Sequence, residues 1–261
     1  MSGIAPAAPS MLQVEDLSKS FGGVAAMQNV TLDFPAGSLT AIIGPNGAGK
    51  TTFFNLISGA MRPDRGRVTL AGEAIGGLSP REIVRRGIVR AFQIASIFPS
   101  LTVAEILTAA VQAHRGDAER MVRRFPLPEC RDRADEVMSL LGLADKAAVT
   151  SSILSHGDQK LLDIGLALAL EPRVLLLDEP TAGMGPEERW QMIAKVQELW
   201  ERQKMTLIFI EHDMDIVFKI AQTIRVLRYG RVLAEGTPGE IRGHPEVIAA
   251  YLGTSQETRE S

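Results

Sequence analysis

The segment Gly44-Pro45-Asn46-Gly47-Ala48-Gly49-Lys50-Thr51-Thr52 decides how the rest of this 261-residue chain is interpreted. It fits the pattern G-x-x-x-x-G-K-[ST], in which glycines let consecutive backbone N–H groups turn inward around phosphate oxygens. The apolar run Leu39–Ile43 (LTAII) precedes it, and a helical pattern (TTFFNLISGAM) follows it. Because a strand before the loop and a helix after it are the context that this motif requires, we predict a site for a nucleoside triphosphate.

Two residues of the loop have specific expected roles. The charge of Lys50 serves the β- and γ-phosphates, and the hydroxyl of Thr51 ligates Mg²⁺. The positive end of the following helix adds to the attraction for phosphate. The predicted nucleotide-binding residues in this segment are Gly44, Pro45, Asn46, Gly47, Ala48, Gly49, Lys50, Thr51 and Thr52.

A pair of acids, Asp178 and Glu179, follows a second apolar run, Val174–Leu177. An acid at the end of a buried strand can hold Mg²⁺, directly or through water, and this is the role expected of Asp178. A second carboxylate beside it is suited to orienting or deprotonating an attacking water, which makes Glu179 the candidate catalytic base. A lone pair of acids at a strand end is often merely solvated. Together with the phosphate loop, however, the pair favours hydrolysis of the nucleotide over nucleotide sensing.

The apolar runs predict an α/β fold. Leu39–Ile43, Val174–Leu177 and Thr206–Ile210 are apolar nearly throughout, as expected of parallel strands that are covered on both faces. Each is followed by polar residues and a helical pattern, which places the site at the carboxyl ends of the strands. Residues 12–34 suggest an antiparallel β layer, and Tyr229-Gly230 is typical of a two-residue hairpin turn.

The domain organisation follows from these elements. We expect a disordered lead at residues 1–10, one domain at 11–253 and a flexible tail at 254–261. Between the first two buried strands, helix caps such as Ser79 and Thr102 indicate several helices, and a mostly helical insert at about 90–160 is expected. Thr237 is expected to cap another helix, and Gly253 is expected to end the last one.

Composition excludes some classes of protein. The formal net charge is −3 and there is no dense block of Lys and Arg, which argues against a nucleic-acid-binding protein. No stretch reaches the ~18 uninterrupted apolar residues that a membrane span needs. We therefore expect a soluble protein, which would act on a membrane through a partner.

Taken together, GPNGAGKTT, Gln93, LSHGDQ, LLLDEP and His212 resemble the ATP-binding cassette (ABC) family of transport ATPases, from about Leu12 to Gly253. The resemblance implies a P-loop NTPase (RecA-like) core with an antiparallel β subdomain and a helical insert subdomain, and it implies ATP and Mg²⁺ as cofactors. In that family the aromatic at the position of Phe21 stacks on adenine, although an ordinary core aromatic remains an alternative here. Gln93 matches the glutamine that links the γ-phosphate and Mg²⁺ to the helical subdomain, and His212 matches the histidine that contacts the γ-phosphate.

The resemblance also implies a site that two subunits share. The family's signature segment, usually LSGGQ, matches Leu154, Ser155, His156, Gly157 and Asp158, and it contacts the γ-phosphate bound by the opposite subunit. His156 and Asp158 depart from the usual residues, and we infer that Asp158 points away from the phosphate and serves the helix cap of Ser155. Gly185 stands where many members have an aspartate that hydrogen-bonds across subunits.

Several segments, including TVAEIL, AGMGPEE and the C-terminal GRVLAEGTPGEIRGHPEVIAAYLG, are similar to branched-chain amino acid uptake cassettes. This implies an ATPase subunit of an importer for branched-chain or other amino acids or related small amide solutes, peripheral on the cytoplasmic face of the membrane. The implied partners are a second cassette (the same chain or another), membrane permease subunits and, indirectly, a solute-binding protein, with no nucleic acid. The alternatives are a lipopolysaccharide-type exporter cassette and a soluble non-transport ABC ATPase. Residues 98–102 either border the permease groove or form a simple turn between helices.

Overall fold

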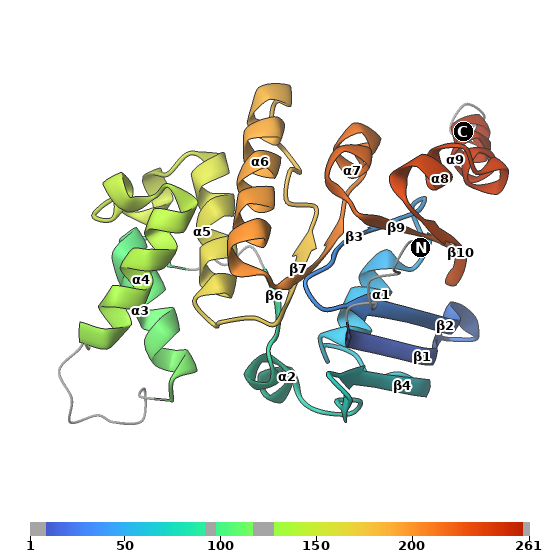
Figure 1. Ribbon diagram of the computed structural model, residues 1–261, viewed down its shortest axis with the longest axis horizontal. Helices are drawn as coiled ribbons and strands as arrows, with labels where there is room; N and C mark the ends of the chain where they lie inside the picture. The colour runs from blue at the N-terminus through green and yellow to red at the C-terminus, as the bar shows by residue number, and fades with distance from the viewer. Residues whose placement is uncertain (1–8, 92–97, 117–127, 258–261) are drawn as a thin grey trace, which may run out of the picture.

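The computed structural model describes residues 9–91, 98–116 and 128–257 of the chain. Its centre is a sheet made of β3 (Leu39–Ile43), β6 (Ile88–Arg90), β7 (Val174–Asp178), β8 (Thr206–Ile210), β9 (Thr223–Arg228) and β10 (Arg231–Gly236). The strands lie in the order β10-β9-β3-β8-β7-β6, and all neighbours are parallel except β9 and β10 (Figure 1). The three predicted strands and the hairpin around Tyr229-Gly230 are confirmed, whereas β6 was not predicted.

Both faces of this sheet are buried, which explains the unbroken apolar runs. In β3, Ala41 and Ile43 face one hydrophobic cluster, while Ile42 faces another. In β7, Leu175 and Leu176 divide between the same two clusters. Successive side chains of a strand point to opposite faces, so a sheet covered on both sides needs apolar residues at every position.

The first cover is a second sheet and one helix. The antiparallel sheet has the order β2-β1-β4-β5 and contains β1 (Ser10–Phe21), β2 (Val24–Pro35), β4 (Arg65–Leu70) and β5 (Glu73–Ala74). Helix α1 (Lys50–Ile57) packs against it, and the ring centroids of Phe34 and Phe53 are 6.2 Å apart. This confirms the predicted antiparallel layer. Strand β1 starts at Ser10, so the last residue of the predicted disordered lead is ordered; residues 1–8 lie outside the described part of the chain.

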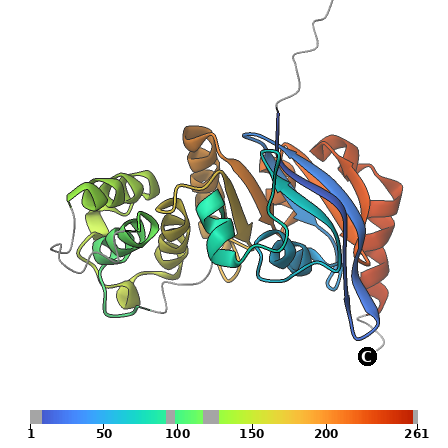
Figure 2. The ribbon, with the colours of Figure 1, turned by 90° about the horizontal axis from the view of Figure 1, so that it is seen from below.

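The second cover is helical. Helix α2 (Pro80–Arg86) places Ile83 in the same cluster as α1 and the antiparallel sheet. The other α-helices are α3 (Val103–His114), α4 (Pro128–Leu141), α5 (His156–Leu168), α6 (Pro186–Gln203), α7 (Met214–Ile220), α8 (Pro238–Arg242) and α9 (Pro245–Glu257). Helices α3 and α4 pack on each other and on α5, at the end of the molecule away from the antiparallel sheet (Figures 1 and 2). The predicted capping boxes of Ser79, Thr102 and Thr237 all form, which is why these helices begin where the sequence indicates.

The end of the last helix differs from the prediction. Gly253 does not terminate it, because α9 continues to Glu257 and includes the first residues of the predicted flexible tail. A glycine inside a helix costs only about 1 kcal/mol relative to alanine, and no proline follows it to stop the helix. In the described part of the chain, no helix has the length and apolar character needed to cross a membrane.

Candidate functional site

The loop between β3 and α1 adopts a backbone path that requires glycine at two positions. Gly44 has a φ of 152°, and a Cβ placed on it would lie 2.2 Å from the carbonyl oxygen of Leu227. Gly49 has a φ of 102°, and a Cβ there would lie 2.8 Å from the carbonyl oxygen of Ala26. The tertiary structure thus presses the loop between neighbouring backbone segments, and only glycine allows this close approach.

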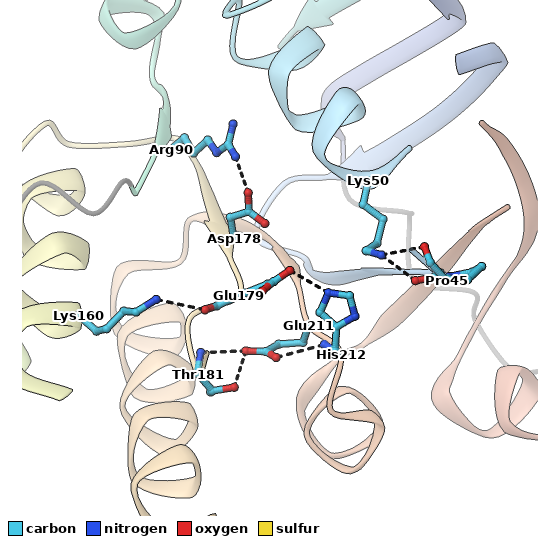
Figure 3. A network of polar contacts seen from close by, with 10 residues as sticks. Pro45, Lys50, Arg90, Lys160, Asp178, Glu179, Thr181, Glu211 and His212 are labelled. Atoms are coloured by element: carbon cyan, nitrogen blue, oxygen red, sulfur yellow. Dashed lines mark hydrogen bonds and ion pairs between the residues drawn. The ribbon is translucent and has the colours of Figure 1, made fainter. Parts of the chain in front are cut away.

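The start of α1 is built to receive an anion. Its N-cap, Gly49, has no side chain to satisfy the first backbone N–H groups of the helix. Lys50 lies at the same helix end, and its Nζ donates to the carbonyl oxygens of Gly44 (2.7 Å) and Pro45 (3.1 Å; Figure 3). The pKa of Lys50 is lowered because burial penalises the ammonium, although the charges of Glu179 and Asp178 oppose the shift.

The acid pair lies opposite the loop, at the end of β7. His212 follows β8 and donates from Nε2 to Oε1 of Glu179 at 2.8 Å, so the predicted base and the predicted γ-phosphate contact meet (Figure 3). Asp178 forms an ion pair with Arg90, whose other terminal nitrogen donates to Oδ1 of Asn55 at 2.7 Å. The site therefore combines residues from the ends of β6, β7 and β8, as expected for a parallel sheet.

The backbone of Glu179 is strained. Its φ of 49° lies in the left-handed region, which costs a residue with a side chain on the order of 1 kcal/mol or more. Surrounding contacts must hold such a residue in place, and they do so here on both sides. The N–H of Glu179 donates to the carbonyl oxygen of Ile210 (3.0 Å), and Lys160 Nζ donates to the carbonyl oxygen of Glu179 (3.4 Å).

Two cavities meet at the acid pair and share Thr51 and Glu179. One, of about 230 Å³, is lined by Ala26, Asn46, Gly47, Ala48, Gly49, Lys50, Thr51, Thr52, Glu179 and His212. The other, of about 370 Å³, is lined by Thr51, Arg90, Ala91, Lys160, Asp178, Glu179 and Ala182. Thr51 and Asp178 line the same cavity. This oxygen donor set fits Mg²⁺, which is typically held by one or two carboxylates together with phosphates.

The signature segment begins α5, as predicted. The hydroxyl of Ser155 accepts from the N–H of Asp158 at 3.1 Å, which confirms the helix cap. Oδ2 of Asp158 accepts from Ser155 Oγ (2.8 Å) and from Lys146 Nζ (2.7 Å), in agreement with the inference that this carboxylate serves the cap. Nε2 of His156 lies 3.3 Å from the carbonyl oxygen of Ala182. A role of this segment at a partner's nucleotide stays a prediction.

Of the remaining predicted site residues, Phe21 does not line either cavity. Gln93 lies outside the described residues. Phe21 ends β1 with 46% of its surface exposed, and Nζ of Lys19 lies 5.8 Å from its ring centroid. This exposure excludes the alternative that Phe21 is a core aromatic, and stacking on adenine stays a prediction.

Sequence reasoning missed three residues that shape the site. Arg90 forms an ion pair with Asp178, and Lys160 donates to the backbone of Glu179. The carboxylate of Glu211 accepts from the N–H of Thr181 (3.0 Å) and from the hydroxyl of Thr181 (2.7 Å). Each residue carries a charge next to or within an apolar run, and Glu211 directly precedes His212. Such charges are rarely buried unless paired, so they could have been flagged, but their partners could not have been named.

Comparisons with known proteins agree with this geometry. The family model described as ABC transporter matches residues 27–182, and the model described as branched-chain amino acid ATP-binding cassette transporter matches residues 231–257. The high-affinity branched-chain amino acid transport ATP-binding protein LivG of Salmonella typhimurium is 39% identical over 249 residues, which cover 93% of this chain and 98% of that protein.

Solved structures show the same fold. An ATP-binding cassette of an ABC transporter in its ADP conformation superimposes with a TM-score of 0.84 at 30% identity, covering 94% of this chain and 99% of the other. A dimeric cassette in a post-hydrolysis state, bound to ADP and inorganic phosphate, has a TM-score of 0.72 at 25% identity and covers 87% of this chain and 99% of that one.

Proposed function

The chain belongs to the ABC transporter family, and on that premise we propose that it is the ATP-hydrolysing subunit of an importer for branched-chain amino acids or related small solutes. The observation that carries the catalytic part is the contact between His212 Nε2 and Glu179 Oε1, 2.8 Å long, at a cavity lined by the phosphate loop. The solute class is supported by the match of residues 231–257 and by the name of the relative from Salmonella.

The phosphate loop binds the nucleotide. The backbone N–H groups at the start of α1 and the ammonium of Lys50 serve the β- and γ-phosphates. Thr51 and Asp178 would hold Mg²⁺, which neutralises charge on the phosphate oxygens when bound. Because Arg90 pairs with Asp178, this carboxylate is held in position at the edge of the cavity.

Hydrolysis needs a base beside the γ-phosphate. The carboxylate of Glu179 borders both cavities and accepts the proton of the attacking water. His212 donates to one oxygen of this carboxylate and limits its rotation. Phe21 stacks on the base of the nucleotide, and Gln93 links the γ-phosphate to the helical subdomain.

Transport requires further subunits. We infer a second cassette, whose signature segment completes the site, and permease subunits that hold both cassettes at the cytoplasmic face of the membrane. The exposed side chains of Phe98 and Ile153 mark a candidate contact for the permease. The two segments that carry these side chains are held together, because Ser151 Oγ donates to the carbonyl oxygen of Phe98 at 2.8 Å. ATP binding closes the two cassettes, and hydrolysis reopens them.

The substitution Glu179→Gln tests the catalytic assignment. ATP binding should be retained, while turnover should fall by about 10²–10⁴-fold, the usual contribution of a general base. Glu201→Gln is a matched control on the exposed side of α6, where the carboxylate accepts from Gln197 at 3.1 Å, and it should hydrolyse ATP normally. Normal turnover in Glu179→Gln would exclude Glu179 as the base.

The import function needs a separate test. A tagged chain, purified from detergent-solubilised membranes of its own cells, should retain permease subunits. Deletion of its gene should abolish uptake of radiolabelled leucine or of a related amino acid or amide. Unchanged uptake of all these solutes, together with impaired export of a lipid or polysaccharide, would assign the chain to an exporter.

A further inference from the structure

The turn that follows the acid pair is held from two opposite directions. Residues Glu179 to Ala182 form a tight turn, in which the N–H of Ala182 donates to the carbonyl oxygen of Glu179 at 3.1 Å. On the side of β8, Thr181 donates to the buried carboxylate of Glu211, and Glu179 donates to Ile210 (Figure 3). These contacts fix one side of the turn to the central sheet.

The other side of the turn is held by α5. Lys160, buried in this helix, donates from Nζ to the carbonyl oxygen of Glu179 at 3.4 Å. Nε2 of His156 lies 3.3 Å from the carbonyl oxygen of Ala182. Residues four apart lie on the same face of a helix, so the two side chains reach the first and last carbonyl groups of one turn. A Cβ on Gly183 would lie 3.1 Å from His156 Nε2, so the glycine leaves room for the ring.

We propose that His156 and Lys160 form a clamp through which α5 positions the Glu179 carboxylate of its own chain. This inference rests on the proposed function, in which the start of α5 serves the nucleotide of a partner cassette. Toward the Glu179 of their own chain both are positioning residues, since they contact the backbone of the turn and not the carboxylate itself. The strained backbone of Glu179 makes such support necessary, because a left-handed residue persists only where its surroundings hold it.

The clamp also gives a meaning to two departures from the family pattern. His156 replaces a signature glycine, and Gly185 lacks the carboxylate that many members use across the subunit boundary. In this chain the imidazole connects the signature helix directly to the segment after the acid pair. A shift of α5 on binding the partner's nucleotide therefore moves the turn that carries Glu179 within the same chain.

Steady-state ATPase kinetics of the full chain test the clamp. His156→Ala and Lys160→Met should each lower kcat by about tenfold or more with KM and the Kd for ATP unchanged, because small misplacements of a catalytic group reduce the rate by up to about 10²-fold. Lys160→Arg and His156→Gln keep a donor in place and should restore most of kcat. Since both residues hold one turn, the double variant should lose less than the product of the two single losses.

Lys195→Met on α6 is a matched control. Nζ of Lys195 pairs with Oε2 of Glu198 at 2.7 Å, and neither residue lines the site, so the change should leave kcat unchanged. His156 is exposed, so its variant is expected to fold even if Lys160→Met does not. Wild-type kcat in His156→Ala, or losses that appear in KM with kcat unchanged, would refute the clamp alone. If the wild-type chain fails to hydrolyse ATP, or if Glu179→Gln hydrolyses it normally, the proposed function is wrong and the clamp falls with it.

Discussion

Replacing Arg90 by methionine should destabilise the nucleotide-free protein more than the protein bound to Mg²⁺ and nucleotide. Arg90 forms an ion pair with Asp178, and the two side chains are 10% and 23% exposed. Methionine keeps an aliphatic stem beside Phe54, whose ring centroid lies 5.7 Å from the guanidinium carbon, but it removes the positive charge. Asp178 then loses its ion-pair partner, and the charge of Lys50 compensates it only in part.

The expected cost follows from the burial of the pair. Removing one partner of a fully buried pair costs about 3–5 kcal/mol, and an exposed pair contributes about 0–1 kcal/mol. Because Asp178 borders a cavity and water can solvate part of its charge, we estimate about 2 kcal/mol. In a domain of this size the Tm falls by about 2–4 °C for each kcal/mol of lost stability, so a loss of about 2 kcal/mol should lower the Tm by about 4–8 °C.

Bound Mg²⁺ should reverse part of this loss. A cation held by Asp178 replaces the charge of Arg90, so the variant should bind Mg²⁺ with a non-hydrolysable ATP analogue more tightly and gain more stability from it. Thermal denaturation with EDTA, and with Mg²⁺ and the analogue, measures the difference. Arg86→Met is the control, because the partner Glu73 is 71% exposed and the change should stay within about 0.5 kcal/mol. An equal fall in Tm under both conditions would refute a role of Asp178 in holding the metal.

Three further substitutions probe other parts of the chain. Asp158→Gln removes the ion pair with Lys146 and should lower stability by up to about 1 kcal/mol in urea denaturation, with ATPase turnover unchanged; a large rise in turnover would show that the carboxylate faces the phosphate. The pKa of Glu240 is lowered because its carboxylate accepts from the N–H and the hydroxyl of Thr237. The stability that this ionised carboxylate adds to the folded state is therefore present above pH 4.5 and is lost as the pH falls further. Glu240→Gln should flatten this acid dependence in denaturant titrations, and an unchanged dependence would contradict the cap. Burial raises the pKa of Tyr251 from 10.0 to about 12, so the stability that the neutral phenol adds to the folded state is lost as the pH rises through that interval. Tyr251→Phe should weaken this alkaline loss of stability, followed by circular dichroism. An identical alkaline profile would argue against the burial of this phenol.

The predictions that the structure confirms rest on local physical chemistry. Each depends on a few neighbouring residues: the glycine and lysine spacing of residues 44–52, the apolar runs of the central strands, and the capping boxes of Ser79, Thr102 and Thr237. Steric limits on the backbone and the hydrogen bonds of helix ends act over three to five residues, so they can be recognised without a fold. The length of α9 was misjudged because a single glycine is only a weak helix stop.

The tertiary structure alone decided which polar groups from distant parts of the chain meet. Arg90 and Asp178 are separated by 88 positions in the chain, Thr181 and Glu211 by 30, and His156 and Ala182 by 26. No pattern of types or spacings specifies such pairs, because they depend on strand order and on how helix α5 packs beside the sheet. The sequence by itself therefore determined a phosphate-binding loop, an acid pair and a capped signature helix. Only the fold decided that this helix, through His156 and Lys160, contacts the turn that carries Glu179. The contact depends on how segments that are distant in the sequence pack against each other.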